Sequence, residues 1–156
     1  MGSDECGWGC IFGCRPTREH ITQLCHIVKR QWDWTDDDVV LNAICALVRQ
    51  DDGAKAFVLL DGGNVVGTCF FDKGNGVTTR FKPWLMALWV APDFRGRGYG
   101  QNLANYAMAY ARKLGFKQIF LDTEKSAKVY HLKHGWRKCS WTVYNGNRVE
   151  IMVHSL

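Results

Sequence analysis

The segment that most restricts how this chain can fold is a glycine-rich stretch, 95–100, between two strongly patterned regions. An apolar, aromatic run at 81–90 precedes it and predicts a central strand. Apolar residues at helical spacing follow it over 103–114 and predict an amphipathic helix. Glycines let backbone amides approach a ligand without a Cβ in the way, and a helix N-terminus adds partial positive charge. A strand, a glycine turn and a helix in this order predict an anion-binding site.

The glycine turn differs from two common phosphate-binding motifs. No Gly-Lys-Ser or Gly-Lys-Thr follows it, as a Walker loop requires, and a dinucleotide fingerprint that began at Gly98 would need glycine where Leu103 stands. What remains is Arg95, followed by Gly98 and Gly100. Arg95 and Arg97 would add charge-assisted hydrogen bonds to a phosphate. We therefore expect a phosphate ligand that is held mainly by backbone amides.

The rest of the chain alternates between strand and helix patterns. Turn signals separate the elements: Asp61-Gly-Gly-Asn64 joins two strands, and Asn145-Gly146 joins the last two. The expected strands are 8–12, 57–60, 65–71, 81–90, 117–121, 137–144 and 149–153, and the expected helices are 21–32, 39–48, 103–114 and 126–134. This order predicts a single α/β domain, residues 1–156, of the α+β type with a mixed sheet flanked by helices.

Composition narrows the class of protein. Hydrophobic residues make up 47% and charged residues 22% of the 156 residues, which suits one packed core and excludes a disordered chain. The formal net charge of +5 comes from scattered basic residues, so neither a nucleic-acid nor a membrane partner is expected. The longest apolar run, 84–92, is about half the roughly 20 residues that a membrane helix needs. We expect a soluble, cytoplasmic protein.

The seven cysteines indicate reduced thiols. An odd number spread along a core-forming chain is not typical of a disulfide framework. Cys6, Cys10 and Cys14, with His20 or His26 nearby, match no structural zinc spacing. No metal site is therefore expected, and the thiols are consistent with a cytoplasmic location.

Val90, Pro92, Arg95, Gly98 and Gly100 together resemble the acetyl-coenzyme A (acetyl-CoA) motif of the GNAT family of N-acetyltransferases. The order of the predicted elements is similar over nearly the whole chain. The resemblance implies a mostly antiparallel mixed sheet in which two parallel strands splay apart around acetyl-CoA, with the Val90 amide placed to stabilise the oxyanion. The residues implied in cofactor binding are Leu88, Val90, Arg95, Gly96, Arg97, Gly98, Tyr99, Gly100 and Gln101.

The resemblance also implies an acid that protonates the departing thiolate, on the helix after the second splayed strand. In the family this acid is usually a tyrosine. Counted forward from 123–125, the position falls on Tyr130; counted back from 135–136, it falls on His131. We predict Tyr130, because the strand determines where the helix begins, and keep His131 as the alternative.

The general base is less defined by the resemblance. Many relatives place a glutamate on the central strand, but 81–90 contains no carboxylate. Glu124, Asp122, His131 or a water relay could take the proton that the acceptor ammonium must lose. Glu124 could equally cap the following helix.

The acceptor is the least determined part of the reading. Trp32 and Trp34 lie in the region that family members use as a lid, and Trp84 lies near the start of the predicted central strand, so all three are candidate acceptor contacts. The resemblance implies direct transfer of acetyl to a primary amine in a ternary complex, and a small-molecule amine is the first choice. The alternatives are an N-terminal or lysyl amine of a protein, and a sensor that binds acyl-CoA without turnover. Either a monomer or a homodimer is compatible with the sequence.

Overall fold

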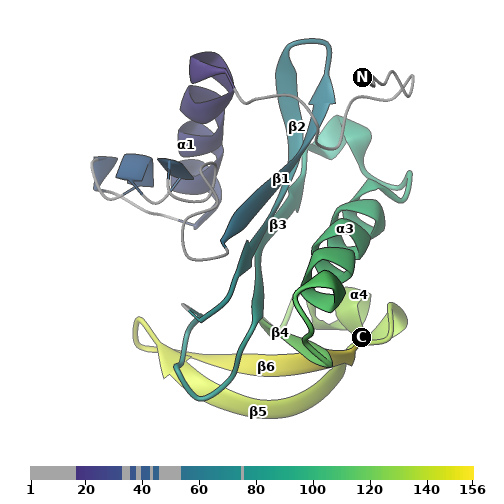
Figure 1. The fold of residues 1–156 in the computed structure, drawn as a ribbon. Helices are drawn as coiled ribbons and strands as arrows, with labels where there is room; N and C mark the ends of the chain where they lie inside the picture. The colour runs from purple at the N-terminus through teal and green to yellow at the C-terminus, as the bar shows by residue number, and fades with distance from the viewer. Residues whose placement is uncertain (1–16, 33–35, 38–39, 43, 46–53, 75) are drawn as a thin grey trace.

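The computed structural model describes residues 17–32, 36–37, 40–42, 44–45, 54–74 and 76–156. Within them, a six-stranded sheet of order β1-β2-β3-β4-β6-β5 has α1 on one face and α3 on the other (Figure 1). The strands are β1 (Lys55–Asp61), β2 (Asn64–Asp72), β3 (Trp84–Val90), β4 (Gln118–Thr123), β5 (Arg137–Tyr144) and β6 (Asn147–Ser155). The helices are α1 (Arg18–Trp32), the short η2 (Pro92–Phe94), α3 (Tyr99–Lys113) and α4 (Lys128–Lys133), and residues 37, 40–42 and 44–45 are also helical.

Strand directions confirm the predicted mixed, mostly antiparallel sheet. All neighbouring strands are antiparallel except β3 and β4, which are parallel. Two elements are shorter than the sequence predicts. The strand predicted over 81–90 begins at Trp84, since Pro83 has no amide hydrogen to give to a ladder. The helix predicted over 126–134 covers only Lys128–Lys133, because a turn closed by the Ala127 amide on the Glu124 carbonyl precedes it. The strand predicted over 8–12 lies outside the described residues.

Glycine-containing chain reversals form where the sequence predicts them. Asn145 and Gly146 both have positive φ, 50° and 78°, as the tight turn between β5 and β6 requires. Gly115, at φ 92°, ends α3. There the Phe116 amide donates to the Ala111 carbonyl at 3.1 Å, which satisfies a helix-end acceptor.

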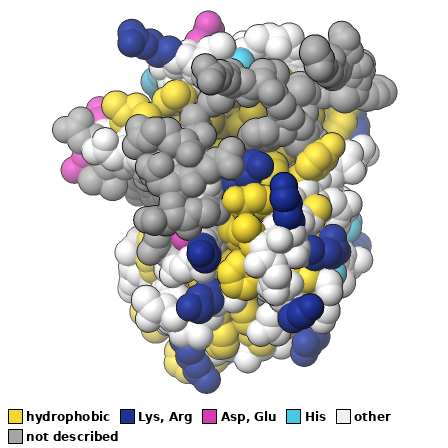
Figure 2. Space-filling model, viewed as in Figure 1, with side chains coloured by type: hydrophobic (Ala, Val, Ile, Leu, Met, Phe, Trp, Pro, Cys, Tyr) yellow, Lys and Arg dark blue, Asp and Glu magenta, His cyan; other side chains and the backbone are white. Residues whose placement is uncertain are grey.

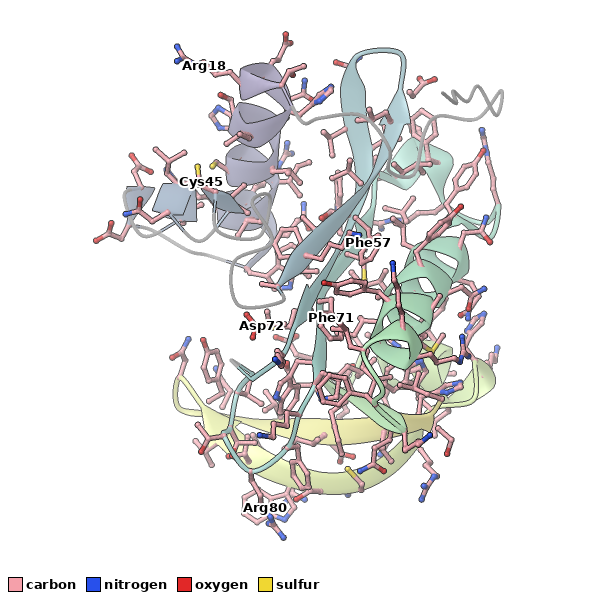
Figure 3. The ribbon with its side chains drawn as sticks, viewed as in Figure 1. Arg18, Cys45, Phe57, Phe71, Asp72 and Arg80 are labelled. Carbon is pink, nitrogen blue, oxygen red and sulfur yellow. The ribbon has the colours of Figure 1, made fainter. Side chains whose placement is uncertain are left out.

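Each face of the sheet packs against its own helix. Alternation along β2 directs Phe71 toward α3 and Phe70 toward α1, and both side chains are fully buried. Phe71 meets the Tyr110 ring of α3 edge to face, with ring centroids 5.1 Å apart. Figure 3 shows Phe57 and Phe71 between the sheet and α3. On the other face Leu24 and Val28 of α1 are buried against the sheet.

A bulge in β3 bends the strand where the site begins. Thr68 of β2 pairs with Trp89, but Phe70 pairs with Met86, so β3 has one extra residue between these pairs. Ala87 in this bulge has φ 51°, which few residues other than glycine adopt. A bulge bends its strand and increases its local twist.

The strands β3 and β4 separate just beyond a single backbone bridge. Trp84 pairs with Phe120, and the Phe120 amide donates to the Pro83 carbonyl at 3.0 Å. The rest of β3, up to Val90, has no described partner on β4. The predicted splay of two parallel strands is therefore present.

The surface in Figure 2 shows Lys and Arg side chains spread around a band of apolar side chains, with few Asp and Glu side chains. Lys55 of β1 lies over the Tyr110 ring, 4.6 Å from its centroid. Burial, helped by Lys113, lowers the pKa of Lys55. On this face the basic residues are distributed rather than gathered in one stripe.

Candidate active site

The turn between β3 and α3 presents backbone amides that the protein does not use. The Phe94 and Arg95 amides close η2 by donating to the Ala91 and Pro92 carbonyls, and helical bonding resumes where the Asn102 amide donates to the Gly98 carbonyl at 3.0 Å. Between them, no hydrogen bond within the described part of the chain has an amide of 96–98 or 100–101 as its donor. The first amides of a helix have no acceptor inside it. These groups are available to an anion.

Left-handed backbone at two glycines shapes this turn. Gly96 and Gly98 have φ 75° and 83°, and Gly98 is the N-cap of α3. Side chains with a Cβ rarely adopt such φ values, so glycine is required here. The residues present therefore fit a phosphate-bearing ligand that approaches the backbone.

Arg95 ties the turn to the end of β3. Its Nε donates to the Val90 carbonyl at 2.7 Å, while the side chain as a whole is exposed. Arg97 is exposed as well and lies over the Phe94 ring, 5.6 Å from its centroid. The turn therefore carries two positive charges, and one of them also holds the loop in place.

The Val90 amide points toward the open edge of β3. The next amide, that of Ala91, donates to the Val66 carbonyl on β2 at 2.8 Å. Successive amides of a strand point to opposite edges, so the Val90 amide faces the side from which β4 has separated. An N–H donor on this edge can stabilise negative charge that develops on a bound carbonyl oxygen.

The Tyr130 side chain of α4 reaches the first turn of α3, near the end of β3. A Cβ built on Gly100 would lie 3.0 Å from the Tyr130 hydroxyl and 3.8 Å from Cγ2 of Val90. The hydroxyl therefore lies against the first turn of α3, close to the end of β3. Burial raises the pKa of Tyr130, which keeps the hydroxyl protonated near neutral pH and able to donate.

His131, the alternative acid, has a different environment. It is only 8% exposed, and its ring packs on that of Trp136 with centroids 6.2 Å apart. Burial, followed by repulsion from His134, lowers the pKa of His131, so the ring is neutral at physiological pH. The structure brings Tyr130, not His131, to Gly100 and Val90.

The other predicted site residues are more dispersed. Glu124 is exposed in the turn after β4, two residues beyond Asp122, which is half-buried. Trp32 ends α1 and is 37% exposed, and Trp34 lies outside the described residues.

Trp84 is a core residue. It is fully buried, and its indole N–H donates to the Phe81 carbonyl at 2.7 Å. A Cβ on Gly76 would collide with the Trp84 ring, so the chain at Gly76 covers it. An acceptor cannot reach Trp84 in this arrangement, and the prediction of such a contact is wrong for the structure described.

Comparison with known proteins agrees with this geometry. The sequence profile of the acetyltransferase (GNAT) family matches residues 21–136. The chain belongs to the GNAT family of acetyltransferases. This match confirms the predicted class of enzyme, an acetyl-CoA-dependent acyltransferase. No curated protein shows significant sequence similarity to the chain.

Solved structures share the fold over almost the whole chain. An aminoglycoside 6'-N-acetyltransferase complexed with coenzyme A superposes with a TM-score of 0.75 at 16% identity, covering 94% of this chain and 95% of the other. The aminoglycoside 6'-N-acetyltransferase from Enterococcus faecium gives 0.73 at 15% identity, with the same coverage of 94% and 95%. The paia N-acetyltransferase from Thermoplasma acidophilum, in complex with coenzyme A, gives 0.71 at 15% identity, covering 94% and 99%. These similarities establish the GNAT fold.

Among the described residues, no helix is both long and apolar enough to cross a bilayer.

Proposed function

We propose that this GNAT protein transfers acetyl from acetyl-CoA to the primary amine of a small molecule, by direct attack in a ternary complex. The observation that carries the proposal is the meeting of three features at one place. Unused amides of the β3–α3 turn, the open edge of β3 at Val90 and the Tyr130 hydroxyl all lie beside Gly100.

Each of these groups has a distinct task in the proposed reaction. The unused amides of this turn, at 97–98 and 100–101, hold the diphosphate. The strand edge at Leu88 and Val90 pairs with the amide-containing arm of the cosubstrate. The Val90 amide stabilises the oxyanion as the amine nitrogen bonds to the thioester carbonyl carbon. Tyr130 then donates its proton to the sulfur as the carbon–sulfur bond breaks.

The class of acceptor is supported by the fold neighbours. Two of the solved structures named above are aminoglycoside 6'-N-acetyltransferases. Because identity to them is 15–16%, they suggest amino sugars as the first acceptors to test, and no more.

Thermal-shift measurements followed by an acceptor panel test the proposal. Coenzyme A should raise the melting temperature, whereas NAD and ATP should not, because a ligand that binds only the folded state stabilises it. No shift with coenzyme A would overturn the proposal. Free-thiol release with amino sugars and small alkylamines should then exceed release with lysine-containing peptides. A higher rate with peptides would favour a protein acceptor, and a shift without turnover would favour a sensor.

A further inference from the structure

A carboxylate on β4 faces the side of the sheet opposite α3. Successive side chains along β4 point to opposite faces of the sheet. Leu121 packs in the cluster with α3, so Asp122 points to the other face, as Phe120 does. It pairs directly with Ile151 of β6, so the two side chains share a face. Phe120 and Ile151 belong to a separate cluster with Trp84. Asp122 therefore lies on the α1 face, while the Tyr130 hydroxyl lies at α3 on the other.

The position of Asp122 along β4 coincides with the start of the splay. The last bridge between the parallel strands joins Trp84 to Phe120. Two residues further along each strand stand Met86 and Asp122, on the same face as the bridged pair. Immediately after Met86 the bulge at Ala87 bends β3. The carboxylate thus occupies the first position on this face at which the two strands no longer pair.

No side chain among the described residues explains the burial of this carboxylate. Asp122 is half-buried, and no hydrogen bond or ion pair joins its side chain to another described residue. Its pairing partner Ile151 is apolar, and so is Met86 at the corresponding position of β3. A partly buried charge without a partner costs free energy unless a ligand compensates it. Burial, and to a smaller extent Glu124, raises the pKa of Asp122, whereas its own amide lowers it.

From this geometry we infer that Asp122 binds the ammonium group of the acceptor from the α1 face and accepts the proton that the nitrogen loses before attack. The inference rests on the proposed function and adds the second half of its proton transfer. One proton passes from the ammonium to the Asp122 carboxylate, and the nitrogen bonds to the carbonyl carbon. The carbon–sulfur bond then breaks, the sulfur takes the Tyr130 proton, and the second proton that the nitrogen loses restores the Tyr130 hydroxyl. Asp122 releases its proton to solvent. Proton acceptor and proton donor thus stand on opposite faces of the splay. The acceptors selected are aliphatic primary amines, which are cationic at neutral pH.

Two small amines of different charge separate a base from a structural residue. Ethanolamine is protonated at pH 7 and needs a base, whereas methoxyamine is already neutral. Thiol release is measured for the wild-type protein and for Asp122→Asn. Each rate of the variant is divided by the wild-type rate with the same amine, so the different intrinsic reactivities of the two amines cancel. We expect kcat/KM of Asp122→Asn to fall about 10²- to 10⁴-fold with ethanolamine, the range for a general base. With methoxyamine the fall should stay below about tenfold.

Asp61→Asn is the matched control, and Glu124→Gln tests the other carboxylate that could act as the base. Asp61→Asn makes the same chemical change at the exposed end of β1 and should leave both rates unchanged. An equal loss with both amines in Asp122→Asn would overturn the inference. So would a selective loss with ethanolamine in Glu124→Gln, because Glu124 would then be the base.

Stability gives a readout that does not depend on turnover. Since Asp122 has no described partner, Asp122→Asn should melt at or above the wild-type temperature and show the wild-type shift with coenzyme A. A lower melting temperature would mark Asp122 as a structural residue and overturn the inference, even if neither amine is turned over. If coenzyme A does not raise the melting temperature of the wild-type protein, the proposed function is wrong. If Asp122→Asn turns over both amines at wild-type rates, only the role of Asp122 is wrong.

Discussion

The contact between Gly100 and Tyr130 allows a test of how accurately the acid must be placed. In Gly100→Ala the new methyl group would lie 3.0 Å from the Tyr130 hydroxyl, where ordinary contact begins at 3.4 Å. The hydroxyl must therefore move by a few tenths of an ångström. A misplacement of about 1 Å can cost roughly 10²-fold in rate, so we expect a loss of about 3- to 10-fold in kcat.

The same substitution should not destabilise the fold. Gly100 is in the first turn of α3 and has no left-handed backbone. Alanine is favoured over glycine within a helix by about 0.5 to 1 kcal/mol, and the lower value applies at a helix end. For a chain of this length the melting temperature should rise by about 1 to 2 °C. Slower turnover in a more stable protein would separate misplacement from unfolding.

A double-mutant cycle with Tyr130→Phe decides the cause. Tyr130→Phe alone should lower kcat about 10²-fold, at the low end for a general acid because a thiolate is a stable leaving group, and leave the coenzyme A shift unchanged. Without the hydroxyl, the methyl group of Gly100→Ala has nothing to displace, so it should cost little further rate. An additive loss in the double variant would refute the reasoning and assign the effect to cofactor binding. The kcat of all four proteins is measured from the rate of thiol release.

Other substitutions test the glycine turn and the attachment of α4. Gly98→Ala places a Cβ at φ 83°, so the fold should lose about 1 to 2 kcal/mol in thermal melts, and the coenzyme A shift should shrink. An unchanged coenzyme A shift would contradict the role of this turn. Lys128 and Lys138, 3.1 and 3.3 Å from the Glu150 carboxylate, hold the pKa of Glu150 below its usual value, the Lys128 hydrogen bond contributing most. A lowered carboxyl pKa stabilises the fold above the unfolded-state pKa, and this stabilisation is lost as pH falls through the folded-state pKa. Glu150→Gln should therefore melt below wild type at neutral pH, and the difference should vanish in acid; a difference independent of pH would exclude the ion pairs as its cause.

Features encoded by neighbouring residues were predictable from sequence. The turn at Asn145 and Gly146 and the end of α3 at Gly115 depend on local backbone preferences, and both form as predicted. The glycine turn at Gly98 belongs to the same class, because its chemistry lies within a few adjacent residues. Such elements need no knowledge of distant partners.

Features that depend on distant partners were not predictable. The bulge at Ala87 arises from how β2 pairs with β3, and alanine gives no sign of a positive φ. The sequence makes Trp84 a candidate for contact with the acceptor, but the chain at Gly76 covers its ring, and only the folded chain reveals where Gly76 lies. Counting residues favours Tyr130 and keeps His131 as the alternative, and only the folded chain shows the Tyr130 hydroxyl beside Gly100 and His131 packed on Trp136.

The single bridge at Trp84 and Phe120 has a mechanical consequence. The sheet thus consists of two parts, β1–β3 and β4–β6, that share one backbone bridge, and the helix α3 packs on both. Because so little backbone hydrogen bonding joins the two parts of the sheet, a molecule bound between them would link them and stiffen the whole domain. Rigidity, and not only chemistry, would then depend on whether the carrier is bound.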